Sequence, residues 1–204
     1  MEGTNSGKLI ILTGTTASGK DAIMHLLLKL HPDYERIITS TTRKPRDLER
    51  NGIDYNFISK EQFEEMDSQG EFLEKNRYAE NFYATPKKEF QKVLDGKTIV
   101  WRIDPTMAAR AKEFFKTEFD EPIANKLTSK TIVIYIYSNP EAMRERLSRR
   151  GMEVADVERR IEQDTRNWDE CKEKFDEVVE NEEGQLDETV KKVISIIEKL
   201  NTTS

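Results

Sequence analysis

The sequence predicts an α/β protein in which a parallel sheet lies between two layers of helices. Short apolar runs typical of buried parallel strands occur at 8–13, 98–103 and 131–137. Segments with helical spacing or helix-capping residues alternate with these runs, which indicates parallel strands covered on both faces. At 204 residues, the chain is long enough to bury such a core in a single domain.

The first half of the chain opens on a strand and includes a long polar segment. A helix after the first strand ends before Pro32, and Ser59 with Gln62 forms a capping box at the start of another helix. The expected elements are a strand at 8–13, a helix at 22–30, a strand at 36–40, a polar loop at 41–54, an extended piece at 55–58, a helix at 59–70, and extended pieces at 72–77 and 82–83.

The second half repeats the alternation of strands and helices. Thr85-Pro86 and Asn139-Pro140 each resemble the start of a helix, because an N-cap residue precedes a proline at the first helical position. The expected elements are helices at 85–96 and 106–115, an irregular polar stretch at 116–130, a strand at 131–137, helices at 139–151 and 154–174, a strand at 175–179 and a terminal amphipathic helix at 186–200.

Composition argues for a cytoplasmic protein without a membrane partner. Charged residues make up 35% of the chain and the mean hydropathy is −0.76. The apolar runs are far too short to span a bilayer, and the first residues are polar rather than those of a signal peptide. Cys171 is the single cysteine, which excludes an intramolecular disulfide framework.

Charge is distributed unevenly along the chain. The net charge of −6 argues against a nucleic-acid polymer as partner. Residues 36–50 nevertheless carry five basic side chains against two acidic ones, a local charge of +3, whereas 167–190 hold ten acids against two lysines, a local charge of −8. A local basic site for small phosphorylated molecules is therefore compatible with the acidic total.

A phosphate-binding loop follows the first predicted strand and precedes the first predicted helix. Its pattern is GxxxxGK, formed by Gly14, Thr15, Thr16, Ala17, Ser18, Gly19 and Lys20. The glycines let backbone amides turn inward around an anion, the helix N-terminus adds positive potential, and Lys20 reaches the β- and γ-phosphates. This context predicts binding of a nucleotide triphosphate.

Asp21 stands where this motif normally has serine or threonine to bind Mg²⁺ through a hydroxyl. An unpaired carboxylate ~4 Å from a phosphate oxygen costs about 4 kcal/mol at an effective dielectric of ~20, so a cation between them or a side chain turned away is required. One hypothesis is that Asp21 holds Mg²⁺ directly or through water. The alternative is an acid that only favours the helix dipole.

The polar loop carries two arginines three residues apart, Arg43 and Arg46, stiffened by Pro45 and preceded by hydroxyl side chains. Guanidinium groups grip phosphate oxygens bidentately, so this loop suits a second phosphate group. The motifs TTRKPR at 41–46, GIDYNF at 52–57, GEFLE at 70–74 and NFYATP at 81–86 follow one another in order. The ordered series, together with the phosphate loop, resembles the guanylate kinase family over nearly the whole chain.

The resemblance implies a P-loop NTPase fold of three layers with a parallel sheet, a small GMP-binding insertion and a lid. It implies one domain over 1–204, with a core at 1–38 and 97–204, a GMP-binding subdomain at 39–96 and a lid at about 145–165. The implied activity is ATP:GMP phosphotransferase, a transferase of purine nucleotide metabolism that uses Mg²⁺ with ATP and forms ADP and GDP. ATP and GMP are then the partners, and the oligomeric state is left undetermined.

The acceptor site that the resemblance implies includes residues on several motifs. Arg43, Arg46, Tyr55 and Tyr83 would bind the GMP phosphate, Glu74 would accept hydrogen bonds from the guanine N1–H and amine, and Thr85 would contact the O6 edge. The two remaining substrate-binding residues are Thr39 and Asp104. Each has a structural alternative: a surface charge for the arginines, ring packing for the tyrosines, a strand-end acid for Glu74 and a turn former for Asp104.

The resemblance places arginines over the ATP phosphates. The implied catalytic residues are Lys20, Arg43, Arg146, Arg149, Arg150 and Arg160, and the spacing leaves open which of Arg149 and Arg150 points inward. Asn181 matches an asparagine near the adenine. Several of these arginines could instead be solvated helix charges paired with glutamates.

Three departures from the family pattern bear on activity. Arg102 replaces an acid, Thr106-Met107 replaces Gln-Gly, and Ala84 replaces a glycine near the base pocket. One hypothesis is that Arg102 and Asp21 are complementary, with the acid moved to the phosphate loop. The departures keep open a kinase for a different nucleoside monophosphate, and a non-catalytic guanylate-kinase-like interaction module is a further alternative.

Overall fold

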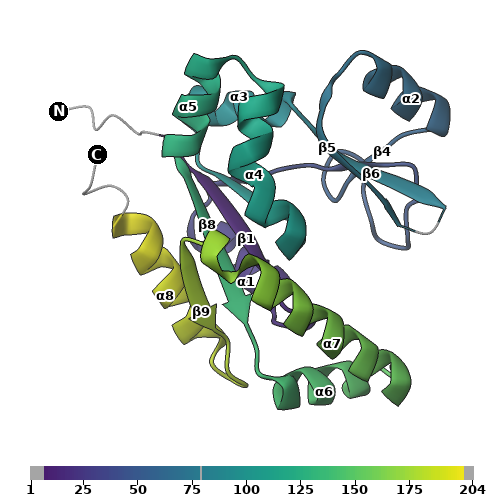
Figure 1. Cartoon of the computed structure of the whole chain (residues 1–204), viewed down its shortest axis with the longest axis vertical. Coiled ribbons are helices and arrows are strands. Elements are labelled where there is room, and N and C mark those ends of the chain that lie inside the picture. The colour runs from purple at the N-terminus through teal and green to yellow at the C-terminus, as the bar shows by residue number, and fades with distance from the viewer. Residues whose placement is uncertain (1–6, 79, 200–204) are drawn as a thin grey trace. The chain divides into compact units, whose positions relative to one another are not determined.

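The computed structural model describes residues 7–78 and 80–199 (Figure 1). Within them the chain forms two compact units. The first contains Glu35–Ile99 and Lys112–Lys130 together with the first described residues, and the second contains Leu9–Tyr34, Val100–Ala111 and the chain from Thr131 onward.

The larger sheet has five strands and confirms the predicted α/β fold. Its order is β2 (Glu35–Arg36), β7 (Ile99–Arg102), β1 (Leu9–Gly14), β8 (Thr131–Tyr137) and β9 (Glu177–Glu180). In the second unit, β8 pairs in parallel with both β1 and β9, and Gly14 at the end of β1 lies opposite Ile136. All six residues of β1 are buried, as expected for a central strand.

Helices cover both faces of the sheet in the second unit. On one face, α1 (Lys20–Leu30) and α8 (Leu186–Lys199) pack against alternate residues of β8, including Ile132, Ile134 and Ile136, to form the main hydrophobic core. On the other face, Trp168 of α7 (Val154–Cys171) packs on Tyr135 of β8, with ring centroids 4.8 Å apart. The period of two along β8 therefore sends neighbouring side chains to opposite helical layers.

A small second core joins the phosphate loop to α6 (Pro140–Arg149) and α7. Ala17 of the loop packs with Met143 and Leu147 of α6 and with Val157 and Ile161 of α7. At the start of α6 the Asn139 side chain accepts a hydrogen bond from the Ala142 amide at 2.9 Å, so the predicted cap is confirmed. The short 3₁₀ helix η1 (Lys172–Lys174) follows α7.

The first unit contains a four-stranded sheet in the order β4 (Asn56–Phe57), β3 (Ser40–Thr41), β6 (Asn81–Pro86) and β5 (Phe72–Tyr78). Phe63 of α2 (Lys60–Ser68) stacks on Phe72 and Phe82 of this sheet. The capping box of α2 is present: the Ser59 hydroxyl accepts from the Gln62 amide, and the Gln62 side chain accepts from the Ser59 amide. Burial of one aromatic face thus holds α2 on the sheet.

In the first unit, a second aromatic cluster packs α3 (Lys88–Leu94) against the end of α4 (Pro105–Glu118). Phe90 of α3 contacts Phe115 and Phe119, with ring centroids 5.5 Å and 6.2 Å away. Phe115 lies near the end of α4, and Phe119 follows it. The next helix, α5 (Glu121–Ser129), buries Ala124 and Leu127.

Three sequence predictions are wrong in their elements. The stretch 116–130 is helical rather than irregular, because it completes α4 and contains α5. Thr85-Pro86 does not start a helix: both residues end β6, and α3 begins at Lys88. The strand expected at 36–40 is two short strands, β2 and β3, which belong to different sheets. The last residue of the predicted terminal helix, Leu200, lies outside the described residues.

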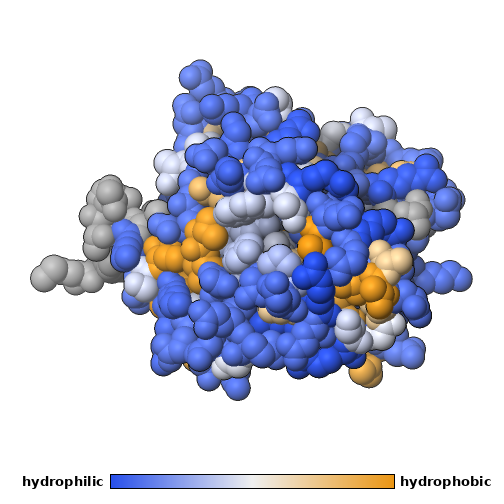
Figure 2. Space-filling model, turned by 60° about the horizontal axis from the view of Figure 1, so that its bottom comes forward, coloured by the Kyte–Doolittle hydropathy of each residue, from blue (hydrophilic) through white to orange (hydrophobic). Residues whose placement is uncertain are grey.

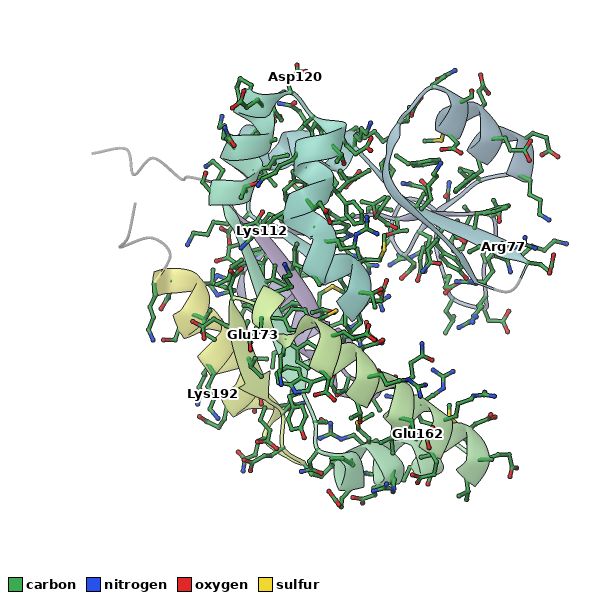
Figure 3. The ribbon with its side chains drawn as sticks, viewed as in Figure 1. Arg77, Lys112, Asp120, Glu162, Glu173 and Lys192 are labelled. Carbon is green, nitrogen blue, oxygen red and sulfur yellow. The ribbon has the colours of Figure 1, made fainter. Side chains whose placement is uncertain are left out.

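The surface is predominantly polar. On the face drawn in Figure 2, hydrophilic side chains cover most of the area and apolar residues form small, separate patches. Exposed charged side chains occur along the helices and strands, and those labelled in Figure 3 include Glu162, Glu173 and Lys192. In the part of the chain that the structure describes, no helix is both long and apolar enough to cross a membrane.

Candidate functional site

Two glycines of the phosphate loop are required by its backbone. Gly14 has a φ of +144°, and a Cβ there would meet the Ile136 carbonyl oxygen at 2.0 Å. Gly19 has a φ of +84°, and a Cβ there would lie 2.5 Å from the Asn181 side-chain nitrogen. Ala17 also adopts a positive φ of 58°, which costs a residue with a side chain about 1–2 kcal/mol. The loop therefore holds the turned-in backbone that the motif predicts.

Buried side chains fix the loop from both ends. The Asn181 side chain donates to the Ser18 carbonyl at 2.7 Å and accepts from the Thr189 hydroxyl at 2.9 Å. The Thr15 hydroxyl accepts from the Ser138 amide at 3.2 Å. Asn181 thus uses both ends of its side-chain amide inside the protein, next to the phosphate loop.

Lys20 folds back onto its own loop. Its Nζ donates to the carbonyl oxygens of Thr15 at 3.0 Å and Gly14 at 3.4 Å. Burial lowers the pKa of Lys20; Asp21 and Asp164 oppose this shift, whereas Arg102 and Arg150 add to it. The ammonium is therefore short of compensating charge, which suits a group that binds phosphate.

The first turn of α1 contains an ion pair in place of an open carboxylate. Asp21 Oδ1 lies 2.9 Å from Arg102 Nε, at the end of β7. Within 7–78 and 80–199, no group of three or more His, Cys, Asp or Glu side chains could hold a metal ion. Because the Asp21 carboxylate is bound to a guanidinium, it is not free to hold a resident Mg²⁺ ion.

Asp164 of α7 is a loop contact that the sequence analysis did not find. Its side chain is 8% exposed, and its Oδ2 accepts a hydrogen bond of 2.6 Å from the Thr16 amide. A carboxylate therefore occupies one of the backbone donors of the phosphate loop. No sequence pattern signals this contact, because 148 residues separate the two partners.

The arginines of α6 differ in their surroundings. Arg146 donates to the carbonyl oxygens of Ala17 and Asn181, each at 3.1 Å, and pairs with Glu183 at 2.9 Å. Arg149 also pairs with Glu183, at 2.8 Å. Glu183 therefore draws both side chains toward the turn before α8, an interaction that the sequence analysis missed.

Arg150 and Arg160 are both exposed. Arg150 is the C-cap residue of α6, and its charge adds to the lowering of the Lys20 pKa. Arg160 lies on α7 and forms no ion pair within the described residues.

The first unit brings together a basic and aromatic cluster around Arg43. Its guanidinium binds Glu49 bidentately, with both N–O distances at 2.9 Å, and lies 5.4 Å from the ring centre of Tyr55 and 5.6 Å from that of Phe57. The Glu49 bond raises the pKa of Arg43, with a further contribution from Tyr83. Arg43 in turn lowers the pKa of Glu49.

The other residues expected at the acceptor phosphate lie around this cluster. Tyr55 and Tyr83 meet edge to face with centroids 6.1 Å apart. The Arg46 side chain is exposed, while its amide donates to Glu49 at 2.7 Å. Glu49 thus accepts hydrogen bonds from the Arg43 side chain and from the Arg46 amide. The sequence analysis missed Glu49 because an acidic residue in a basic loop is ordinarily explained as charge balance.

Glu74 and Thr85 face each other across β5 and β6. The Thr85 hydroxyl, which is buried, donates to Glu74 Oε1 at 2.7 Å. A bulge between Phe72 and Glu74 sets this register. The Thr39 carbonyl accepts from the Asn56 amide at 2.9 Å, which places Thr39 beside β4 in the same unit.

Asp104 belongs to the second unit, apart from the other expected substrate residues. Its Oδ1 accepts from the Thr106 amide at 3.0 Å, the Thr106 hydroxyl at 2.6 Å and the Met107 amide at 3.2 Å. This is an N-cap of α4, and the two residues that depart from the family pattern supply its donors. A structural role for Asp104 is therefore established.

Comparison with known proteins assigns a family. A family model described as guanylate kinase matches residues 6–200. The guanylate kinase of Wolbachia sp. subsp. Brugia malayi is 31% identical over 198 residues, which cover 96% of this chain and 94% of that protein. That of Trichormus variabilis is 42% identical over 115 residues, but this alignment covers only 56% of this chain and 58% of that relative's length. The crystal structure of guanylate kinase from Anaplasma phagocytophilum superposes with a TM-score of 0.65 at 22% identity, covering 96% of this chain and 86% of that one, which supports the fold.

Proposed function

The chain belongs to the guanylate kinase family, and we propose that it transfers the γ-phosphoryl group of ATP to GMP, giving ADP and GDP. The observation that carries the choice of GMP is the Glu74–Thr85 pair, whose hydroxyl and carboxylate oxygens are 2.7 Å apart. A carboxylate at this position accepts from the paired N1–H and amine donors of guanine. Adenine has no N1–H to offer, and a site built on such bonds rejects analogues that lack them.

The donor nucleotide is assigned to the phosphate loop of the second unit. Its triphosphate would take the Lys20 ammonium, whose present partners are the two loop carbonyls at 3.0 and 3.4 Å, and loop amides other than those of Thr15, Thr16 and Ser18, which are bonded within the protein. Of the lid arginines, we assign Arg150 and Arg160 to the phosphates. Arg146 and Asn181 would frame the nucleotide from the positions where they hold the loop.

The acceptor phosphate is assigned to Arg43, Arg46, Tyr55 and Tyr83 in the first unit. The guanidinium of Arg43 already donates two parallel hydrogen bonds to a carboxylate, that of Glu49, at 2.9 Å. A phosphate group offers a similar pair of acceptor oxygens and carries more negative charge than a carboxylate. GMP would therefore compete with Glu49 for this guanidinium. Thr39 and Asp104 complete the proposed substrate residues.

The reaction needs no covalent intermediate on the protein. A GMP phosphate oxygen forms the new bond to the γ-phosphorus as the bond from that phosphorus to the ADP bridging oxygen breaks, and the electron pair leaves with ADP. Lys20 and the lid arginines would offset the charge that spreads over the transferring group. We assign residues 39–96 to acceptor binding and about 145–165 to a lid that excludes water.

The proposal includes Mg²⁺ bound with ATP, a cytoplasmic location, and no nucleic-acid or membrane partner. Because Asp21 is paired with Arg102, the metal would enter with the nucleotide, whose phosphates and waters would supply most of its ligands. It would supply charge neutralisation of the phosphate oxygens. Asp21 could reach it only with the Arg102 pair opened.

An acceptor panel tests this function. The protein is mixed with ATP, Mg²⁺ and one of GMP, dGMP, AMP, UMP or CMP, and ADP release is followed. We expect turnover with GMP, at least tenfold weaker kcat/KM for GMP in Glu74→Gln, and loss of turnover in Lys20→Met. Turnover with AMP but not GMP would indicate a different nucleoside monophosphate kinase. No turnover with any acceptor would indicate a binding module.

A further inference from the structure

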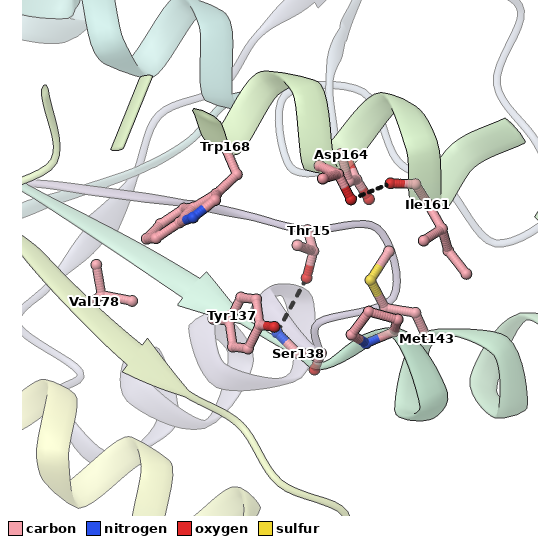
Figure 4. A pocket seen from close by; sticks show the side chains of 10 residues that line it. Thr15, Tyr137, Ser138, Met143, Ile161, Asp164, Trp168 and Val178 are labelled. Carbon is pink, nitrogen blue, oxygen red and sulfur yellow. Dashed lines mark hydrogen bonds between the residues drawn. The ribbon is translucent and has the colours of Figure 1, made fainter. Parts of the chain in front are cut away.

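A pocket of about 420 Å³ lies in the second unit beside the phosphate loop, between α7 and the ends of β8 and β9 (Figure 4). It lies on the α7 face of the sheet, away from the face covered by α1 and α8. Its walls include Tyr137, Met143, Ile161, Asp164, Trp168 and Val178. None of these residues has a role in the proposed phosphoryl transfer.

The pocket contains a buried carboxylate with one uncommitted oxygen. Asp164 is 8% exposed, and its Oδ2 accepts the Thr16 amide at 2.6 Å. In the described part of the chain, the other oxygen has no hydrogen-bond or ion-pair partner. Lys20 is near enough to act on it electrostatically, but its Nζ donates to Thr15 and Gly14. This oxygen is not one of the buried polar atoms that lack a partner, so it is open to solvent in the pocket, where a cation can bind it.

The rest of the wall suits the body of such a cation. The rings of Trp168 and Tyr137 lie 6.1 Å apart at an interplanar angle of 46°, as two inclined walls. Aromatic faces attract ammonium groups, and Met143, Ile161 and Val178 offer apolar surface to a hydrocarbon. A ligand that matches these walls therefore has one positive end and one apolar end.

The charge around the pocket is mixed. Trp168 and Val178 belong to the stretch 167–190, which holds ten acids against two lysines, whereas Arg146 donates to the hydroxyl of Ser138, another wall residue, at 2.8 Å. The guanidinium of Arg146 is already paired with Glu183 at 2.9 Å. The free charge on the wall is therefore that of Asp164, which selects a cation.

We propose that this pocket binds a small organic cation: a primary ammonium on an aromatic or branched aliphatic body. The ammonium donates to the free oxygen of Asp164, and the body packs on Trp168 and the apolar wall. Since Asp164 also holds Thr16, the ligand acts on the phosphate loop from the side opposite to α1. This site does not depend on the identity of the phosphate acceptor.

Three ligands of similar size test the site: benzylamine, benzyl alcohol and benzoate, titrated at pH 7 without nucleotide. Tryptophan fluorescence reports binding. Trp101 is the only other tryptophan, so the signal that is lost in Trp168→Phe is the part that comes from Trp168. We expect benzylamine to bind at least tenfold more tightly than benzyl alcohol, and benzoate to show no saturable binding. Equal affinity for benzylamine and benzyl alcohol, or no binding of benzylamine up to ~10 mM, would overturn the proposal.

Two variants locate the binding. Asp164→Asn keeps an oxygen for the Thr16 amide but removes the charge, so benzylamine should bind at least tenfold more weakly. Val178, which is 47% exposed, offers a second route if that variant does not fold: Val178→Lys places a repelling ammonium at the pocket, with Val178→Thr as its matched control. Benzylamine affinity should fall in Val178→Lys and stay within twofold in Val178→Thr. Unchanged affinity in both Asp164→Asn and Val178→Lys would place the ligand elsewhere and refute the site.

Discussion

Asp21 and Arg102 form an ion pair of 2.9 Å that joins the first turn of α1 to the end of β7. The pair agrees with the hypothesis that the two departures from the family pattern are complementary. The Arg102 side chain is 34% exposed and that of Asp21 62%, so the pair contributes less than about 1 kcal/mol to stability. In the proposed function, the pair directs a carboxylate away from the loop that we assign to the ATP phosphates.

Breaking this pair from the arginine side should weaken ATP binding. In Arg102→Met the Asp21 carboxylate is released beside the loop, where ~4 Å from a phosphate oxygen it would cost up to about 4 kcal/mol at an effective dielectric of ~20. We expect KM for ATP to rise at least tenfold in Arg102→Met and to recover in Asp21→Ser/Arg102→Met. Steady-state kinetics of the wild type, both single variants and the double variant measures the coupling. Strictly additive effects would mean that the two side chains act separately.

Leu48 is strained, and replacing it with glycine should stabilise the protein. It is the third residue of a turn in which the Glu49 amide donates to the Arg46 carbonyl at 3.1 Å, and its φ is +72°. The side chain is 97% exposed, so no packing is lost. Relief of about 1–2 kcal/mol of strain exceeds the 0.5–1 kcal/mol entropic cost of glycine.

Urea unfolding of Leu48→Gly should therefore show a gain of about 0.5–1 kcal/mol. Asp47→Gly is the matched control, because Asp47 lies in the same turn and is not among the residues with positive φ. That control should lose stability by the ordinary glycine penalty. A loss of stability in Leu48→Gly as well would show that leucine is tolerated there without strain.

Much of the fold was predictable because local signals and tertiary packing agree. The strand at 131–137 matches β8 residue for residue, and the caps at Ser59 and Asn139 are both formed. The error at α5 has a physical cause. This nine-residue helix buries only two apolar side chains, Ala124 and Leu127, so the spacing of apolar residues is too short a pattern to identify a helix from the sequence. Its position depends on burial in the first unit rather than on local propensity.

The motifs identified basic residues of the candidate site but not the acidic residues that pair with them. The motifs pointed to Arg43, Arg146 and Lys20, all of which lie in clustered, partly buried positions. Glu183 and Asp164 reach these clusters only through the tertiary fold, from 37 and 148 residues away. Charge partners at such separations leave no spacing pattern in a single sequence.

The Arg43–Glu49 contact should make stability depend on pH. The hydrogen bonds from Arg43, and from the Arg46 amide, lower the pKa of Glu49 in the folded protein. A lowered carboxyl pKa adds stability that is present above the unfolded value of about 4.3 and is lost as the pH falls through the folded value. The wild type should therefore unfold at a higher urea midpoint than Glu49→Gln at pH 7, and the difference should shrink from pH 5 to pH 3.

The control for that effect is Glu64→Gln, since Glu64 is exposed on α2 and forms no ion pair within residues 7–78 and 80–199. Its midpoint should track the wild type across the same range. A Glu49→Gln difference that is equally large at pH 3 and pH 7 would contradict an ionised Glu49 as its source.

Asn181 should matter to the stability of the phosphate loop before it matters to the nucleotide. It is 6% exposed and donates to the Ser18 carbonyl at 2.7 Å, so Asn181→Ala removes the side-chain donor of a buried carbonyl, whereas the Thr189 hydroxyl keeps its bond to the Gln185 carbonyl at 2.9 Å. An unsatisfied buried group costs about 1–3 kcal/mol, and we expect a loss of about 2 kcal/mol in urea unfolding. Asn139→Ala, which removes one helix cap, should lose only about 1 kcal/mol. If Asn181→Ala instead kept wild-type stability and raised only KM for ATP, the side chain would serve the nucleotide base, and its hydrogen bonds to the loop would be secondary.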